Sequence, residues 1–346
     1  MLNSHEGILS YIIPNNILRT TTYDIVRKYI LDNTSICQIV DLGSGVFEKV
    51  TASTIILQLS NKIKNVNKLS VITEVKNLTL GQFSKKQLSQ AQFKINTSFA
   101  FNILGETKTL EISKRLESFH CYLGELCLFI SPGIDGNKEK YIANSKINNK
   151  YKPIIFGKNI KRFRIDFDEK FILYDKNLLN RSRNESIFIS NKIVIQRISG
   201  GKKPIVAAFD KGAYYTFNSV NNIILKDNNI QDLYAILALL NSDLINWYYA
   251  KNFSNESTLT VNISKTYLEK IPIPKIDIRI KELIYHMVDE LITLGGTDSR
   301  NSRTLELDRK LNYIIYKLYG LDYNEILWID PQTSITHEEY EKGGIL

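Results

Sequence analysis

Apolar and polar positions alternate along this chain in short blocks, and the blocks predict a mixed α/β fold. The apolar run at 7–13, GILSYII, ends at Pro14 and predicts a buried strand. Residues 21–33, TTYDIVRKYILDN, place apolar side chains at helical spacing. Two runs rich in β-branched residues, ICQIVDLG and TASTIILQLS, predict two more strands. These elements make a partial Rossmann-like sheet, because a doubly wound domain needs more alternating units.

The pattern changes after residue 61, where the chain becomes polar and predicts a connecting segment with a helix or two. Strand-like runs then alternate with basic loops, which predicts a mixed α+β domain. In RISGGKKPIV the paired glycines predict a hairpin turn, and residues 230–249 predict one apolar helix. Two amphipathic helices, at 276–295 and about 303–319, close the chain. The predicted organisation is a partial sheet at 1–64, a connecting segment at 65–115, a second domain at 116–275 and a helical tail at 276–346.

The sequence Asp-x-Gly-x-Gly at 41–45 follows an apolar run, which is the usual start of a nucleotide or S-adenosylmethionine pocket. Such a pocket needs a helix directly after the glycines and an acidic residue about 20 positions later. The residues after Gly45 favour a strand, and no Asp or Glu occurs between Glu48 and Glu74. The motif therefore predicts a tight turn between two strands, and we assign no cofactor-binding residue here.

Composition narrows the class of protein. The net charge of +9 and the pI of about 9.1 favour a polyanionic partner. Three cysteines, without Cys or His pairs at ligand spacing, fit a reducing cytoplasm and predict no metal site. No run of apolar residues approaches bilayer-spanning length, so we expect a cytoplasmic protein without a membrane partner.

The positive charge is concentrated in one segment. Residues 138–211 contain 18 Lys or Arg and 7 Asp or Glu, so their surplus exceeds that of the whole chain. Phosphate neutralisation by such a surface supplies much of the affinity of a protein for duplex DNA. Gln196 and Arg197 could read adenine and guanine, but strand alternation predicts that at most one reaches a base. The candidate DNA-binding residues are Asn137, Lys138, Lys158, Lys161, Arg162, Arg164, Arg181, Arg183, Gln196, Arg197, Lys202 and Lys203.

An ordered series of segments carries a family resemblance. GILSYIIPNNIL, YDIVRKYILDN and ICQIVDLGSGVFEKVTASTIILQLSN resemble the stretch after the catalytic Pro-Pro turn of γ-type N6-adenine DNA methyltransferases, the TaqI-like and type IIG restriction–modification enzymes. PGIDGNKEKYIA, YKPIIFGKNIKRFRI, FILYDK, KIVIQRISGGKKPIVAAFD and LEKIPIP resemble the target-recognition domain of the same family. KLYGLDYNEIL resembles the helical tail of its longer members.

The resemblance implies a C-terminal half that recognises duplex DNA, with S-adenosylmethionine and the Pro-Pro turn on an N-terminal methyltransferase half. None of the seven prolines is adjacent to another, so we assign no catalytic residue and expect this chain alone to be inactive. Phe47 falls where the family places an aromatic that stacks on the extruded adenine, although core packing is the alternative. The resemblance also implies a partner half or self-association. Two other readings stay open: a general RNA- or DNA-binding scaffold, and an active methyltransferase with a divergent cofactor site.

Overall fold

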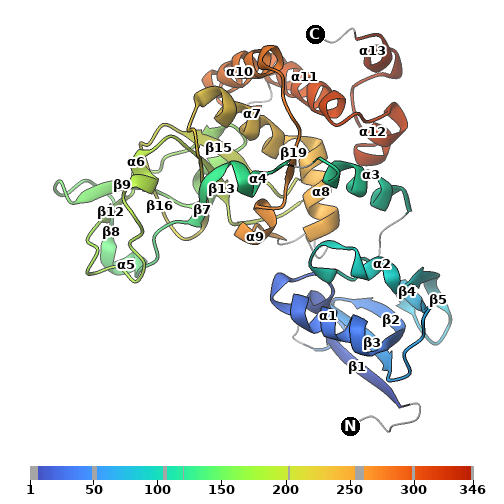
Figure 1. The fold of residues 1–346 in the computed structure, drawn as a ribbon. Coiled ribbons are helices and arrows are strands. Elements are labelled where there is room, and N and C mark those ends of the chain that lie inside the picture. Colours follow the sequence, from blue (N-terminus) through green and yellow to red (C-terminus); the bar gives the residue numbers. More distant parts are fainter. Residues whose placement is uncertain are drawn as a thin grey trace. The chain divides into compact units, whose positions relative to one another are not determined.

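The computed structural model describes residues 7–48, 53–103, 107–119, 121–201, 203–253, 261–297 and 301–343. The chain divides into two compact units. Unit 1 comprises Met1–Glu111 and Lys251–Glu256, and unit 2 comprises Ile112–Ala250 and Ser257–Leu346. The predicted α/β class is confirmed, because both units combine sheets with helices (Figure 1).

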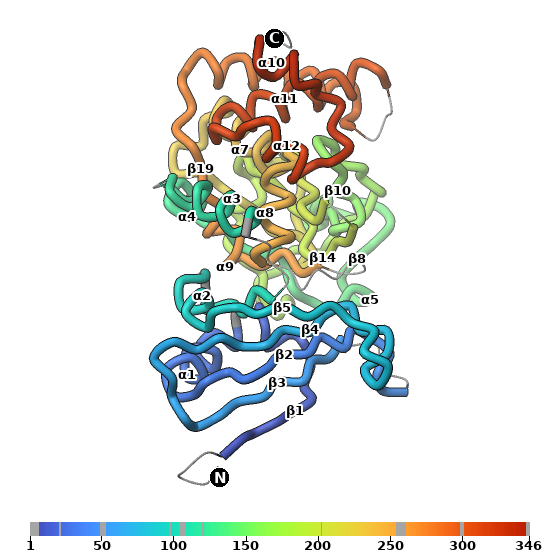
Figure 2. Tube along the Cα trace, turned by 90° about the vertical axis from the view of Figure 1, so that its right-hand side faces the viewer, coloured from blue at the N-terminus to red at the C-terminus, as the bar shows by residue number. Residues whose placement is uncertain are grey.

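Unit 1 contains a five-stranded sheet in the order β1-β3-β2-β4-β5, and the strands lie side by side in that order in Figure 2. Strands β2 and β4 are parallel and the other neighbours are antiparallel. Ile30 and Leu31 of the first helix pack into the core of the sheet. The elements are β1 (Ile8–Pro14), α1 (Asp24–Asn33), β2 (Ser35–Gly43), β3 (Thr54–Ser60), β4 (Lys68–Asn77), β5 (Gln82–Ser89) and α2 (Ala91–Lys94), with 3-10 turns at Asn15–Leu18, Thr21–Tyr23 and Thr97–Phe99. Helix α3 (Thr107–Glu117) begins in unit 1 and continues into unit 2.

Two predictions for this region were wrong. β1 is a strand but not a buried one, because it forms the sheet edge and leaves Ile8 63% exposed. Residues 68–89 form β4 and β5, although the sequence predicted a connecting segment with helices. β4 buries Leu69 and Val71 completely, but β5 is a polar edge strand, so polar composition concealed the strand pairing.

Unit 2 contains two four-stranded sheets, in the orders β15-β13-β17-β7 and β16-β9-β12-β8. Its first elements are β6 (Cys121–Tyr122), α4 (Leu123–Leu126), β7 (Cys127–Pro132), α5 (Lys138–Tyr141), β8 (Ile142–Ala143), β9 (Tyr151–Ile155), η4 (Gly157–Asn159), β10 (Ile160–Lys161), β11 (Arg164–Ile165), β12 (Phe171–Leu173) and α6 (Ser186–Ile189). Then follow β13 (Lys192–Gln196), β14 (Ile198–Ser199), β15 (Ala207–Asp210), β16 (Tyr215–Thr216) and β17 (Val220–Leu225). As predicted, β13 and β15 form an antiparallel hairpin.

Helices complete unit 2: α7 (Ile230–Asn241), α8 (Asp243–Phe253), α9 (Lys265–Leu268), α10 (Ile278–Thr293), α11 (Ser302–Leu318), α12 (Tyr323–Ile329) and α13 (His337–Lys342), with β18 (Val261–Asn262) and β19 (Pro272–Ile273) between them. α10 and α11 confirm the two predicted closing helices. The helix predicted at 230–249 is interrupted at Ser242, which has extended backbone angles. No described helix is long and apolar enough to cross a membrane.

Side chains at this interruption complete the edge of a sheet. The amide of Asn241 accepts a hydrogen bond from the backbone N of Ala207 (3.1 Å) and donates one to the backbone O of the same residue (3.0 Å). Asn246 Oδ1 accepts from the backbone N of Ile205 (2.7 Å). Ala207 begins the edge strand β15 and Ile205 lies just before it, so these buried asparagines bond buried backbone groups at the start of a sheet edge.

Candidate nucleic-acid interface

Asp41 and Gly43 of the Asp-x-Gly-x-Gly segment are the end of β2, and residues 44–48 after them belong to no helix or strand. The antiparallel strand β3 begins only at Thr54, so the connection is longer than the predicted tight turn. Gly43 and Gly45 have φ values of 70° and 81°, in the left-handed region that glycine adopts without strain. Asp41 Oδ1 accepts a hydrogen bond from the backbone N of Gly43 (3.0 Å). Phe47 lies in this connection and is 47% exposed, so the core-packing alternative does not hold for it.

In unit 2 the basic residues fall into groups with different surroundings, and the first group is tied into the fold. Arg162 forms an ion pair with Asp308 of α11 (2.8 Å) and donates to the backbone O of Asn241 (2.7 Å). Arg164 pairs with Asp166 (2.7 Å) and donates to the backbone O of Gly295 (2.9 Å). These side chains connect the β10–β11 hairpin to the helices, so both predicted DNA ligands have a structural role.

Glycines at the end of α10 allow this close approach. Gly296 has a φ of 78°, and a Cβ atom there would lie 2.4 Å from the backbone O of Arg162. Only a residue without a side chain fits that contact. The hairpin and the helix end are therefore held together by backbone contact as well as by the arginines.

Lys203, predicted at the hairpin tip, also has an acidic partner in the fold, since it forms an ion pair with Asp243 at the start of α8. Burial raises the pKa of Asp243 above its usual range, against the opposing effect of Lys203. Lys202 lies outside the described residues. Lys161 is half-exposed on β10, and its backbone pairs with that of Arg164.

A second group, here called the arginine cluster, consists of Arg181, Arg183 and Arg197. Among the described residues none of the three forms an ion pair within 4 Å. Burial lowers the pKa of Arg183, and the charges of Arg181 and Arg197 lower it further, whereas Asp135 opposes the shift. Arg181 and Arg197 are therefore like charges acting on Arg183. Such a group is stabilised by a bound anion.

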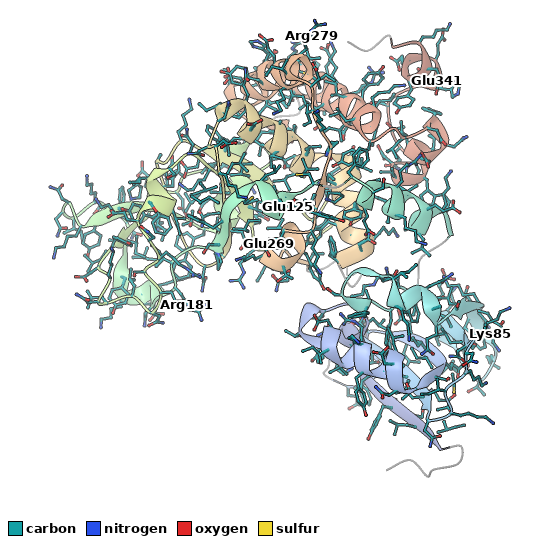
Figure 3. The ribbon with its side chains drawn as sticks, in the orientation of Figure 1. Lys85, Glu125, Arg181, Glu269, Arg279 and Glu341 are labelled. Carbon is teal, nitrogen blue, oxygen red and sulfur yellow. The ribbon has the colours of Figure 1, made fainter. Side chains whose placement is uncertain are left out.

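Backbone contacts hold the arginine cluster in place. Arg183 has a φ of 64°, which is strained for a residue with a side chain, and its Nε donates to the backbone O of Gly133 (3.3 Å). Arg197 donates to the backbone O of Asn218 (2.9 Å). Asn218 in turn donates to Asp135 (2.8 Å), and Asp135 forms a β-bridge with Arg181. Figure 3 labels Arg181, which lies at the end of unit 2 that carries α5.

Gln196 is the last residue of β13, whereas Arg197 lies in the bend between β13 and β14. Gln196 donates to the backbone O of Ile160 (2.8 Å) and lines a cavity, whereas Arg197 belongs to the arginine cluster. Lys138 and Lys158 line the same cavity. Asn137 caps α5 by accepting a hydrogen bond from the backbone N of Lys140 (3.2 Å), so in this structure its side chain stabilises the start of the helix.

Sequence reasoning missed several residues of this surface. Asn218 connects Arg197 with Asp135, and Lys170 lines the cavity beside Gln196. Asn218 carries no charge, so a concentration of basic residues does not indicate it. Among the described residues, no three His, Cys, Asp or Glu side chains gather where they could hold a metal ion.

Comparisons with known proteins agree with the resemblance read from the sequence. Residues 152–273 match the family model described as the TaqI-like C-terminal specificity domain. This region is therefore similar to a specificity domain, and the resemblance to TaqI-like enzymes is confirmed. The match includes the basic residues from Lys158 to Lys203.

One curated relative is the type II methyltransferase M.MjaIV of Methanocaldococcus jannaschii, 25% identical over 192 residues, which are 52% of this chain and 58% of the relative. Among solved structures, the type IIL restriction–modification enzyme MmeI in complex with DNA shares the fold over 98% of this chain and 50% of its own, with 12% identity and a TM-score of 0.59. A DrdV–DNA complex covers 84% of this chain and 38% of its own, with 10% identity and a TM-score of 0.52. The chain thus spans about half the length of these relatives.

Proposed function

We propose that this chain recognises duplex DNA as the specificity half of an N6-adenine DNA methyltransferase in a restriction–modification system. The observation that carries the proposal is the arginine cluster inside the specificity domain. Its repelling charges fit a DNA phosphate, because charge-assisted hydrogen bonds to an anion relieve the repulsion. In this proposal S-adenosylmethionine and the methyl-transfer residues belong to a methyltransferase half outside this sequence.

Phosphate contacts position a protein on DNA, and contacts with base edges supply sequence specificity. We assign the arginine cluster to the phosphates. Phe47 of unit 1 is exposed and available to stack on an extruded adenine. The bases that the domain reads are not assigned.

Exposed apolar side chains on unit 1 support a contact with a methyltransferase half. The edge strand β1 exposes Ile8, Tyr11 and Ile12, and α1 exposes Ile25 and Tyr29. Apolar side chains beside an unpaired strand edge mark a contact surface. We infer that this surface binds the methyltransferase half, or a second copy of the chain in its absence. Light scattering of the purified chain should show association, and a clean monomer would count against the inference.

The test of the proposal compares three ligands by fluorescence anisotropy and calorimetry. Duplex DNA should bind, with log K falling linearly as log salt rises, and single-stranded RNA of equal length should bind more weakly. S-adenosylmethionine alone should give no binding heat. Equal or tighter binding of the RNA would favour the scaffold alternative, and micromolar binding of S-adenosylmethionine would favour an active methyltransferase with a divergent site.

A further inference from the structure

A cavity of about 640 Å³ in unit 2 is not explained by phosphate contacts. Residues near strand ends of both four-stranded sheets line it, including Ile142 of β8, Phe156 after β9 and Gln196 of β13. Its volume lies within the range of small-molecule pockets and is far larger than a phosphate group needs. The site therefore suits a ligand with a bulky planar part.

One wall of the cavity is apolar and has a cation at its side. Ile142, Phe156 and Ile198 supply the apolar surface. The ammonium of Lys138 lies 5.2 Å from the centroid of the Phe156 ring and 4.9 Å from that of Phe217. Cation–π contacts hold an ammonium in place while leaving its N–H groups able to donate to an acceptor. A planar group and an anionic group can thus be bound side by side.

The amide of Gln196 has a fixed orientation. Its Nε2 donates to the backbone O of Ile160 (2.8 Å), and that contact requires nitrogen rather than oxygen at this position. The second amide hydrogen and the oxygen Oε1 of Gln196 are not used by this bond. One donor beside one acceptor matches the N7 and N6 edge of adenine, whereas guanine presents two acceptors there.

The charges of the cavity wall allow one anionic group. Lys138, Lys158 and Lys170 face two acidic residues, Glu139 and Asp168. Lys158 forms an ion pair with Asp168 (2.7 Å), and the ammonium of Lys170 donates to the uncharged amide of Asn144. Lys138 is the cation that lies against the aromatic rings of the apolar wall, so it is placed to receive a phosphate beside a base on that wall.

We propose that this cavity binds a single adenine nucleotide, with the base on the apolar wall beside Gln196 and the phosphate at Lys138. The nucleotide is either free or an unpaired adenosine of a nucleic-acid strand. This goes beyond the duplex recognition proposed above, and the site can fail while the binding of fully paired duplex stands.

The first experiment titrates the full chain with AMP and GMP by calorimetry. AMP should bind at least about 5-fold more tightly than GMP, and Gln196→Leu should remove the preference. Lys138→Met should weaken both nucleotides, whereas Lys146→Met, an exposed lysine outside the cavity wall, should change neither. Lys138 is exposed, so its substitution tests the site without disturbing the core. The fluorescence of Trp247 and Trp328, both in unit 2, checks that each variant is folded.

A second experiment identifies the source of the nucleotide. Duplexes with one bulged adenosine, one bulged guanosine or no bulge are compared in anisotropy titrations. Tighter binding of the adenosine bulge that Gln196→Leu removes supports an unpaired nucleotide in a strand, and AMP binding without bulge preference supports a free nucleotide. The proposal is overturned if adenine is preferred in neither experiment, or if binding is unchanged in both Lys138→Met and Gln196→Leu.

Discussion

Two groups of basic residues in unit 2 are similar in composition but have different surroundings in the structure. In KNIKRFR the arginines meet carboxylates and carbonyls of the helices, and Arg162 is only 14% exposed beside Asp308. In the arginine cluster Arg181 and Arg197 act as like charges on Arg183, and Arg183 and Arg197 donate to the backbone oxygens of Gly133 and Asn218 instead of to carboxylates. A surplus of charge alone does not indicate a binding surface. The distribution of the acidic partners separates basic residues that stabilise the fold from those available to an anion.

The largest expected effect is a loss of stability when Arg162 is replaced. Arg162→Ala should lower the free energy of unfolding by about 3 kcal/mol, because it leaves Asp308 without its partner and Asn241 without a donor. Urea unfolding followed by tryptophan fluorescence measures the change in unit 2 alone, since both tryptophans are there. The exposed Lys146→Ala is the matched control. A variant of unchanged stability with a lower salt dependence of DNA binding would make Arg162 a DNA ligand instead.

Substitutions in the arginine cluster should change DNA binding and not stability. Arg181→Ala combined with Arg197→Ala should reduce the slope of log K against log salt by roughly one unit per arginine. Stability should not fall because of lost charge, since removing these charges relieves their repulsion of Arg183. Anisotropy titrations with duplex DNA from about 50 to 200 mM salt provide the slope. An unchanged slope would exclude the cluster from the phosphate contacts.

The smallest expected effect is a pH dependence of the free energy of unfolding, and it concerns Asp243, the partner of Lys203. Because the pKa of Asp243 is raised in the fold, mainly by burial, the folded protein binds this proton more tightly than the unfolded chain. The contribution of Asp243 should therefore become less favourable as the pH rises from 3.8 through its raised pKa. Urea unfolding at several pH values should show Asp243→Asn gaining stability relative to the native chain over that window. A constant difference would contradict the assignment.

The sequence predicted elements well where one face is buried. β2, β3, α1 and the closing helices have strong apolar periodicity, and the structure contains each of them. β5 was missed because its edge position leaves polar side chains along it. The interruption at Ser242 was missed although Asn241, Ser242 and Asp243 form a polar triplet between two apolar runs. In the structure Ser242 Oγ accepts a hydrogen bond from the backbone N of Ile245 (3.2 Å) at the start of α8.

The candidate site was predictable in composition but not in arrangement. Net charge located the basic segment, yet it could not distinguish Arg164, bound to Asp166 and Gly295, from Arg183. That distinction depends on contacts between residues far apart in the sequence. Strand alternation could not place Arg197 relative to Gln196, because Arg197 lies in a bend after the last residue of β13.

The asparagines at the α7–α8 junction have a consequence for pairing with other chains. Asn241 bonds both backbone groups of Ala207, the first residue of the edge strand β15, and Asn246 bonds the backbone N of Ile205 just before that strand. These backbone groups are therefore closed to an added strand from another molecule, so this end of the sheet edge is protected against sheet-to-sheet pairing.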